Sequence, residues 1–268
     1  MILRVEHTSE FAYDGLIAEA YTELRLRPLE GGGQHCSSFR LSTQPSGVRV
    51  REYRDHFANG VQHFDVLESH DRLTVTAVSE VSTPGSSAGL RQVPTPLELY
   101  DYLRPTDYAP FSGGVSEFAA RHAGTAAGTE RARGLMGAIS AELVYDPSAT
   151  DVQTRADEVL ALGRGVCQDF THVLLAACRC IGIPARYVSG YLYDPKLEGD
   201  NAASHAWVDV WDAERGWFAL DPTHDRDQTE SYVRVAVGRD YADVPPTRGV
   251  FKGLARETLT VRVSLQAL

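Results

Sequence analysis

Three residues of reactive type follow one another in the second half of the chain: Cys167, His205 and Asp221. A cysteine thiolate is a strong nucleophile, a histidine can take up and return a proton, and an aspartate can orient that histidine. In this interpretation Asp221 accepts the Nδ1–H bond of His205 and stabilises the imidazolium. Each residue alone is more often structural, as a small core cysteine, a strand-end histidine or an aspartate in a turn before proline.

The elements that carry these residues make the nucleophilic interpretation the stronger one. Cys167 follows a glycine-punctuated turn and begins a helix with one periodic face, on which lie Cys167, Phe170, Thr171, Leu174, Leu175, Cys178 and Ile181. The free N–H groups at a helix start favour the thiolate. His205 opens an alternating strand and Asp221 ends the next one. If these strands pair, a helix–strand–strand unit brings all three side chains together.

Neighbouring residues of reactive type receive structural interpretations. Asp169 fits the first helical turn, where a carboxylate is stabilised. His172 projects from a different helical face than Cys167 and is expected to support the fold or Asp169. His224 follows Asp221 closely and is expected at the mouth of the site. Cys178 is expected in the core and Cys180 on another face, without a disulfide between them.

A metal site is the competing hypothesis, since Cys167, His172, His205 and Asp221 are all of ligand type. The sequence contains no CxxC pair and no HExxH helix, and a triad explains the order with fewer residues. We therefore expect no metal and no cofactor.

Composition and charge exclude several classes of function. The 268 residues are 43% hydrophobic and 23% charged, which is ordinary for a globular protein. A net charge of −10 argues against general binding of nucleic acid. No apolar run approaches the roughly 20 residues of a membrane helix, so we expect no membrane partner. The first residues lack the features of a secretory signal, and the four cysteines are interpreted as reduced thiols, which predicts a cytoplasmic location.

The first third of the chain alternates with a period of two between turn clusters, which predicts an antiparallel β-sandwich for residues 1–90. The expected strands span residues 3–8, 21–27, 39–43, 48–53 and 73–81. Asn59-Gly60 indicates a hairpin ending in the run 61–66. A segment rich in Pro, Ser and Gly, residues 84–96, is the expected linker.

Residues 91–268 are expected to form the second, catalytic domain. Helices are predicted over 116–123 and 156–161, with a longer one between them that Thr129 caps and that stops near Asp146-Pro147. After the Cys167 helix the period returns to two, with strands at 186–192, 205–211, 217–220, 232–237 and 259–265. The last of these is isolated and can return to the N-terminal domain.

Several motifs together resemble the bacterial transglutaminase-like family. They are the nucleophile run 164–172, the strand 183–191, the Ser204-His205-Ala206-Trp207 and Leu220-Asp221-Pro222-Thr223 motifs, and the tail 235–246. The β-rich first third is similar to the N-terminal domain of that group, so the resemblance covers nearly the whole chain. It implies an α+β protein with a papain-like transglutaminase core and a Cys167–His205–Asp221 triad. Gln168 stands where calcium-dependent animal transglutaminases usually have Trp, so their protein crosslinking is not carried over.

These observations predict a cysteine-dependent acyl-transfer enzyme that cleaves an amide or peptide bond through a thioester, with a peptide or protein amide as substrate. The backbone N–H of Cys167 is one expected oxyanion donor, and the second is not identified. Hydrolysis is favoured over transfer because water is abundant and no acceptor-amine site is visible. The alternatives are a transamidase of the protein-glutamine type and a catalytically silent peptide-binding module. The sequence leaves the oligomeric state open.

Overall fold

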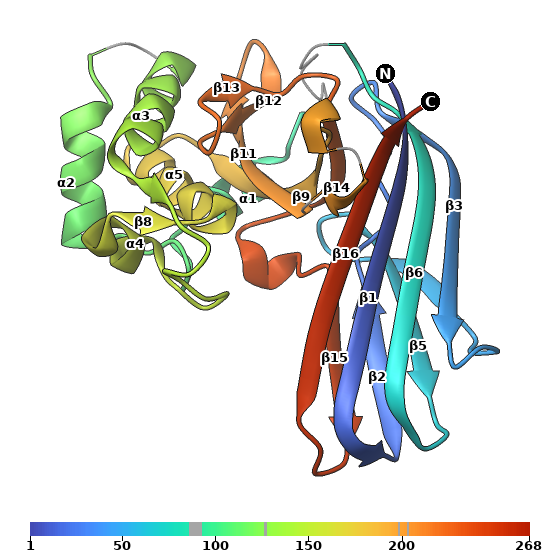
Figure 1. The fold of residues 1–268 in the computed structure, drawn as a ribbon. Helices are drawn as coiled ribbons and strands as arrows, with labels where there is room; N and C mark the ends of the chain where they lie inside the picture. The colour runs from blue at the N-terminus through green and yellow to red at the C-terminus, as the bar shows by residue number, and fades with distance from the viewer. Residues whose placement is uncertain (86–92, 126–127, 198, 203) are drawn as a thin grey trace.

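The computed structural model describes residues 1–85, 93–125, 128–197, 199–202 and 204–268. It is a mixed α+β protein in which a layer of helices, a central sheet and a β-sandwich follow one another (Figure 1). The expected α+β class, with an N-terminal antiparallel β-sandwich followed by a domain of helices and strands, is confirmed. Most of the predicted linker, residues 86–92, lies outside the described residues. Among the described residues no helix is both long and apolar enough to span a membrane.

The β-sandwich consists of two antiparallel sheets. One has the order β10 (Gly199–Ala202), β16 (Glu257–Ala267), β1 (Ile2–Ile17), β6 (His70–Ser82) and β3 (His35–Gln44). The other has the order β15 (Thr247–Lys252), β2 (Glu19–Leu24), β5 (Gly60–Val66) and β4 (Arg51–Arg54). Because successive side chains of a strand alternate between faces, every second residue of β1 is buried, and Phe11, Tyr13 and Ile17 enter the core between the sheets.

The end of the chain completes both sheets of the sandwich. β16 pairs with β1 over its full length, from Leu3 opposite Ala267 to Tyr13 opposite Glu257. β15 pairs in the same antiparallel manner with β2. The two chain ends therefore lie side by side (Figure 1), and the edge of β1 that β6 leaves free is covered.

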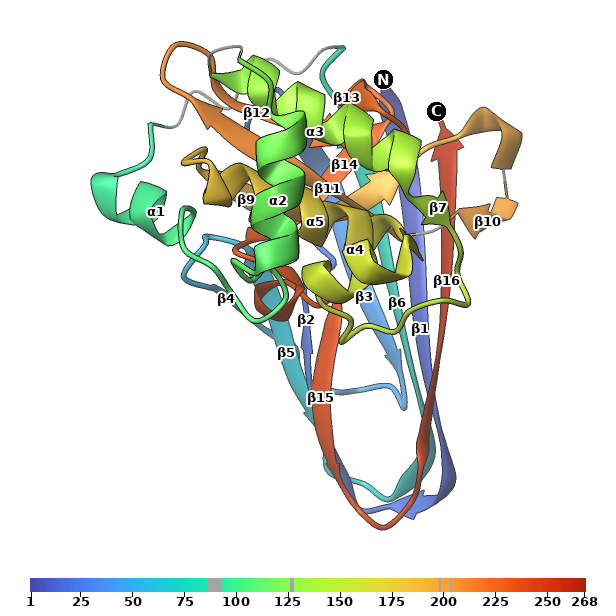
Figure 2. The same cartoon turned by 90° about the vertical axis from the view of Figure 1, so that its left-hand side faces the viewer.

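The other half contains the helices α1 (Pro96–Asp101), α2 (Gly113–His122), α3 (Thr129–Glu142), α4 (Ala156–Leu162) and α5 (Cys167–Cys180). Its central sheet has the order β13 (Arg226–Asp227), β12 (Gly216–Asp221), β11 (Ser204–Asp212), β9 (Ala185–Leu192) and β14 (Tyr232–Gly238). Short elements complete it: β7 (Val144–Tyr145), β8 (Arg164–Gly165), η1 (Pro195–Leu197) and η2 (Tyr241–Asp243). The apolar face of β11, predicted from alternation, packs with α5 in one core. Figure 2 shows α5 behind α2.

Helix α3 differs from the sequence prediction at both ends. Gly128 is its N-cap, and Thr129 is already helical, with no side-chain hydrogen bond at the cap. The helix ends at Glu142, before Asp146-Pro147, because Val144 and Tyr145 form a short parallel pair with β8. This pairing places the chain beside the turn that leads into Cys167.

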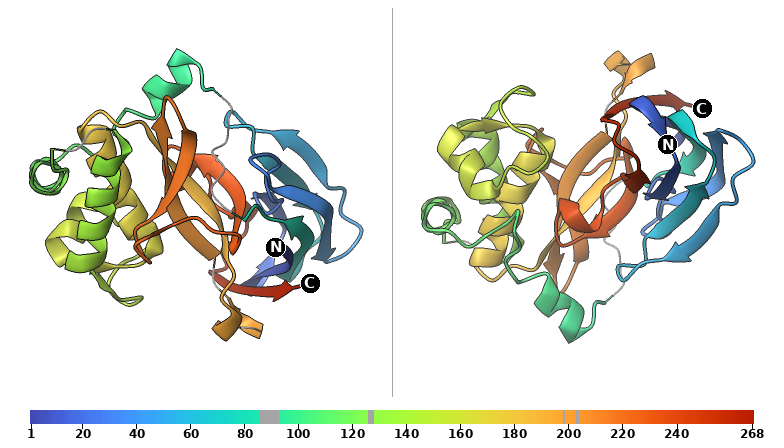
Figure 3. Two further views of the ribbon diagram at one scale, coloured as in Figure 1. Left: turned by 90° about the horizontal axis from the view of Figure 1, so that it is seen from above. Right: turned by 90° about the horizontal axis from the view of Figure 1, so that it is seen from below.

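The two halves meet along β14, the edge strand of the central sheet (Figure 3), and at β10, which pairs with β16. Two amide side chains of the β-sandwich bond the strand's free backbone groups as a neighbouring strand would. Gln34 bonds both N and O of Arg234, and Asn59 bonds both N and O of Val237, with each of the four distances 2.8 Å. Buried apolar residues from both halves pack beside them. The sandwich therefore closes the open edge of the sheet that carries the candidate site.

Candidate active site

Cys167 is the first residue of α5, and local contacts fix the turn before it. Asp169 accepts a hydrogen bond from the backbone N of Val166 at 2.7 Å and one from Thr150 Oγ1 at 2.6 Å. A Cβ at Gly165 would lie 2.6 Å from Asp169 Oδ2, so this position requires glycine. The thiol of Cys167 is half-buried, whereas the rest of the helix is largely buried. The structural interpretation of Asp169 matches these contacts.

His205 and Asp221 meet across the paired strands β11 and β12. Their hydrogen bond joins His205 Nε2 to Asp221 Oδ2 at 2.7 Å, and both side chains are buried. The prediction that Asp221 would bond Nδ1 is wrong. The register sets Val208 opposite Leu220, so Asp221 stands opposite Trp207 and only diagonally from His205. Diagonal neighbours are about 7–8 Å apart, a spacing that favours the bond from Nε2, the ring nitrogen farther from the backbone.

Asp221 receives more donors than the sequence indicated. Besides His205, its Oδ2 accepts from Tyr232 Oη at 2.6 Å and from His224 Nδ1 at 2.9 Å. Its Oδ1 accepts from the backbone N of Thr223 at 2.9 Å. Sequence reasoning missed Tyr232, which opens a strand three places away from β12 in the sheet. His224, expected at the mouth of the site, is indeed partly exposed but also bonds the carboxylate.

The electrostatics of the buried pair favour two opposite charges. Burial alone would lower the pKa of His205, but hydrogen bonds to Asp221 and Cys167 outweigh it and raise the pKa to about 9. Burial alone would raise the pKa of Asp221, but the hydrogen bonds from His205 and His224 hold it well below its usual range. Since Nε2 is engaged by Asp221, the ring nitrogen available to Cys167 is Nδ1. The structure thus brings the three predicted residues together, with His205 between Cys167 and Asp221.

Comparison with known proteins identifies the family to which this fold belongs. Residues 116–222 match the model of the transglutaminase-like superfamily, and residues 3–82 match the bacterial transglutaminase-like N-terminal region. An uncharacterised protein of Mycobacterium leprae is 34% identical over 99% of both chains. The chain belongs to the transglutaminase-like superfamily. An uncharacterised protein of Mycobacterium tuberculosis is 33% identical over 92% of this chain and 86% of its own.

Two further matches concern a solved structure and a protein with a named activity. The solved structure named "a Putative Cysteine Protease from Cytophaga hutchinsonii" superposes with a TM-score of 0.80 at 20% identity, over 100% of this chain and 91% of that one. At this identity it shows the fold, including the β-sandwich. A protein-glutamine gamma-glutamyltransferase of Pseudomonas aeruginosa is 29% identical over 40% of this chain and 18% of its own.

The other histidine and the cysteines of α5, His172, Cys178 and Cys180, make contacts that support the fold. His172 is buried and stacks on Tyr108, with ring centroids 5.0 Å apart, and its Nε2 accepts from the backbone N of Tyr241. Burial lowers the pKa of His172 to about 3, so it is neutral and supports the fold, not Asp169. Burial raises the pKa of Cys178 to about 12, and Cys180 lies 3.4 Å from Ser116 Oγ. All four cysteines are free thiols.

The ligand-type atoms of His205, Asp221 and His224 lie within 4.8 Å of one another. His172, the other histidine of the competing metal hypothesis, is not among them. The distances from Asp221 Oδ2 to its donors, 2.6–2.9 Å, are those of hydrogen bonds. A metal would have to displace the shared protons. We therefore interpret the cluster as a hydrogen-bonded proton-sharing group.

A second buried carboxylate lies on the same face of β11 as His205. Asp209 accepts two hydrogen bonds of 2.6 Å from Arg234 and one of 3.0 Å from Arg186. Arg186 stacks on Trp217, with its guanidinium 4.3 Å from the ring centroid. Burial alone would raise the pKa of Asp209, but the two arginines lower it. Asp209 therefore joins strands β9, β11 and β14.

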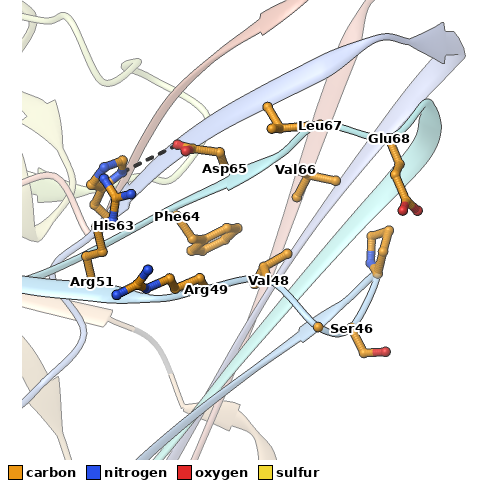
Figure 4. Close-up of a pocket in the computed structure, with 12 residues that line it drawn as sticks. Ser46, Val48, Arg49, Arg51, His63, Phe64, Asp65, Val66, Leu67 and Glu68 are labelled. Atoms are coloured by element: carbon orange, nitrogen blue, oxygen red, sulfur yellow. Dashed lines mark ion pairs between the residues drawn. The ribbon is translucent and has the colours of Figure 1, made fainter.

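The hollow drawn in Figure 4 belongs to the β-sandwich and not to this site. Its volume is about 310 Å³, and its lining comes from residues 45–49, Arg51 and residues 63–68. Arg49 and Arg51 stand toward one end and Glu68 toward the other, with Phe64 and Val66 between them (Figure 4). No triad residue contributes to its walls, so its volume says nothing about the chemistry of Cys167.

Proposed function

We propose that the chain is a cysteine-dependent acyl-transfer enzyme that cleaves an amide or peptide bond through a thioester intermediate. The observation that carries the proposal is the buried 2.7 Å bond between His205 Nε2 and Asp221 Oδ2, which leaves Nδ1 as the nitrogen for the hydrogen bond of His205 with Cys167 at the start of α5. Superfamily membership supports it, since a thiol nucleophile is typical of such folds. The substrate class is a peptide or protein amide.

In the proposed cycle, His205 carries the proton that is transferred in each step. The Cys167 thiolate attacks the carbonyl carbon, and the C–N bond breaks as His205 gives its proton to the leaving amine. Water then adds to the thioester while His205 takes the water proton, and the C–S bond breaks to release the acid. Asp221 holds the ring throughout and stabilises its charged form.

The helix start supplies part of the oxyanion site. The first N–H groups of an α-helix have no intrahelical partner, and Cys167 occupies the first position of α5. Its backbone N–H is therefore available to the negative oxygen of the tetrahedral intermediate.

Hydrolysis is the favoured outcome, and transfer to an amine is the alternative. The glutamyltransferase of Pseudomonas aeruginosa aligns with only 40% of this chain, so its named activity is weak support for transfer. Both outcomes proceed through the same thioester and differ only in the acceptor.

The test is a library of peptides and peptide amides, analysed by mass spectrometry with and without an added primary amine. We expect hydrolysed products that disappear in the Cys167→Ala variant and a trapped acyl-enzyme after rapid quenching. Amine-coupled products in place of acids would move the assignment to a transamidase. A parent protein that neither turns over the library nor labels Cys167 with a covalent thiol probe would leave the catalytically silent binding module as the better account.

A further inference from the structure

His224 lies in a tight hairpin whose shape is held from several sides. The hairpin joins β12 to β13, and Asp221 pairs with Arg226 across it. Asp225 has a φ of 49°, in the left-handed region that residues other than glycine seldom adopt. Arg133 of α3 bonds the carboxylate of Asp227, with Nη2 and Oδ2 2.7 Å apart. The hairpin therefore presents His224 to Asp221 in one defined orientation.

The oxygen that His224 bonds is already crowded. Asp221 Oδ2 accepts from Tyr232 at 2.6 Å, from His205 at 2.7 Å and from His224 at 2.9 Å. A carboxylate oxygen offers about two lone-pair directions, so three donors must share them. Arg226 Nε donates to Tyr232 Oη at 2.9 Å, which directs the hydroxyl proton of the tyrosine to Asp221. His205 and His224 are left to compete for the remaining acceptor capacity.

The two competing histidines are in contact and differ in exposure. Their ring centroids are 5.2 Å apart in an edge-to-face arrangement. The side chain of His224 is 42% exposed, against 7% for His205. The charged or titratable groups around the pair are Cys167 of α5, Tyr232 of β14 and Arg226 of β13, with Arg133 of α3 acting on the same hairpin through Asp227. Besides the side chains of His205, His224 and Tyr232, the described residues that bond the Asp221 carboxylate are Thr223 and His224, through their backbone N–H groups.

We propose that His224 is a positioning residue that limits how strongly Asp221 holds the protonated ring of His205. This inference rests on the proposed function, because it assigns the role through His205 as proton donor. By taking part of the Oδ2 charge, His224 leaves His205 able to release its proton to the leaving amine. Without the His224 N–H, the full carboxylate charge acts on His205, which then keeps its proton to higher pH.

Three substitutions at one position separate this role from a structural one. His224→Ala removes the donor, His224→Asn places an amide nitrogen close to the former Nδ1, and His224→Gln places it farther out. Titration of ¹³C-labelled histidine rings by NMR, with His205 assigned from the His205→Ala spectrum, should show a higher His205 midpoint in the Ala and Gln variants. The Asn variant should stay near the parent. His35→Ala, in which an exposed side chain of the β-sandwich is lost, is the matched control.

Turnover gives the second measurement. With the best substrate of the library, kcat of His224→Ala should fall about fivefold at neutral pH with KM unchanged, the size expected for one hydrogen bond. The His224→Asn variant should recover most of the loss. An unshifted His205 midpoint in His224→Ala, or an Asn variant as impaired as the Ala variant, would overturn the inference.

The rate of Cys167 alkylation shows whether a negative result concerns only His224 or the proposed function as a whole. If the parent alkylates fast at mildly acidic pH and His205→Ala abolishes that reactivity, the triad stands whatever His224 does. If the parent alkylates slowly and independently of His205, the proposed function fails, and the His224 inference fails with it. Should His224→Ala not fold, the comparison of the Asn and Gln variants decides the inference alone.

Discussion

Two buried aspartates lie close together in the central sheet and have opposite kinds of partner. Asp209 is surrounded by Arg234 and Arg186, which carry a permanent charge. Asp221 is surrounded by His205, His224 and the hydroxyl of Tyr232, whose protons can move. Both carboxylates are almost fully buried, so burial alone does not separate a structural site from a chemical one.

The difference is one of partners and of position. Arg234 is buried and Arg186 is mostly buried, and the two tie three strands together. Asp221 ends its strand at a hairpin, and one of its histidines is open to solvent. A buried carboxylate paired with arginine fixes the fold, whereas one paired with histidine can take part in proton transfer.

The largest expected effect is at the nucleophile itself. Cys167→Ala should reduce turnover by at least about 10⁴-fold, because the thioester cannot form and only substrate binding remains. The melting temperature should stay close to that of the parent, since the thiol is only half-buried. Steady-state kinetics and calorimetry on the same preparations measure both. Residual turnover within tenfold of the parent would show that the nucleophile lies elsewhere.

Asp221→Asn should have the second-largest effect on turnover. The amide cannot stabilise the imidazolium of His205 as the carboxylate does, so kcat should fall by roughly 10²–10⁴-fold. Stability should change far less than activity. Comparison of kcat with the unfolding midpoint checks this. A variant that unfolds but keeps its specific activity would make Asp221 a structural residue like Asp209.

Asp209→Asn should show the reverse pattern. Loss of this charge leaves Arg234 and Arg186 buried without an anion, which should lower the free energy of unfolding by about 3–5 kcal/mol. The fraction that remains folded should keep its turnover. Urea unfolding monitored by tryptophan fluorescence, together with active-site titration, separates the two quantities. Loss of turnover without loss of stability would contradict the comparison.

The smallest effect concerns pH. With the pKa of His205 at about 9, the imidazolium beside Cys167 persists from acidic pH to about pH 9 and is lost above it. Iodoacetamide should therefore label Cys167 at pH 6 at least about tenfold faster than Cys36, Cys178 or Cys180, because a free thiol of pKa about 8.5 is almost wholly protonated at that pH. Burial raises the pKa of Cys36 and Cys178 further. His205→Ala should remove this advantage, and Asp221→Ala should reduce it less. Equal labelling of all four cysteines at pH 6 would exclude the ion pair.

Much of the fold and of the candidate site follows from local patterns. The period of α5, the alternation of β11 and the turn before Pro222 place Cys167, His205 and Asp221 at the ends of their elements. These positions depend only on neighbours a few residues away, so the sequence displays them. The cap of α3 was predicted wrongly because Gly128, with a positive φ, takes the position that a side-chain cap would otherwise mark.

The remainder depends on strand order and register, which no local pattern encodes. The sequence by itself determined which residue types stand at which element ends, and hence that a thiol, an imidazole and a carboxylate were candidates for one site. The tertiary structure alone decided that Asp221 bonds Nε2 of His205, that Tyr232 arrives from the far edge of the sheet, and that Asp209 is held by arginines. The physical reason is that each contact joins side chains from different strands, and the order and register of those strands across the sheet set which atoms meet.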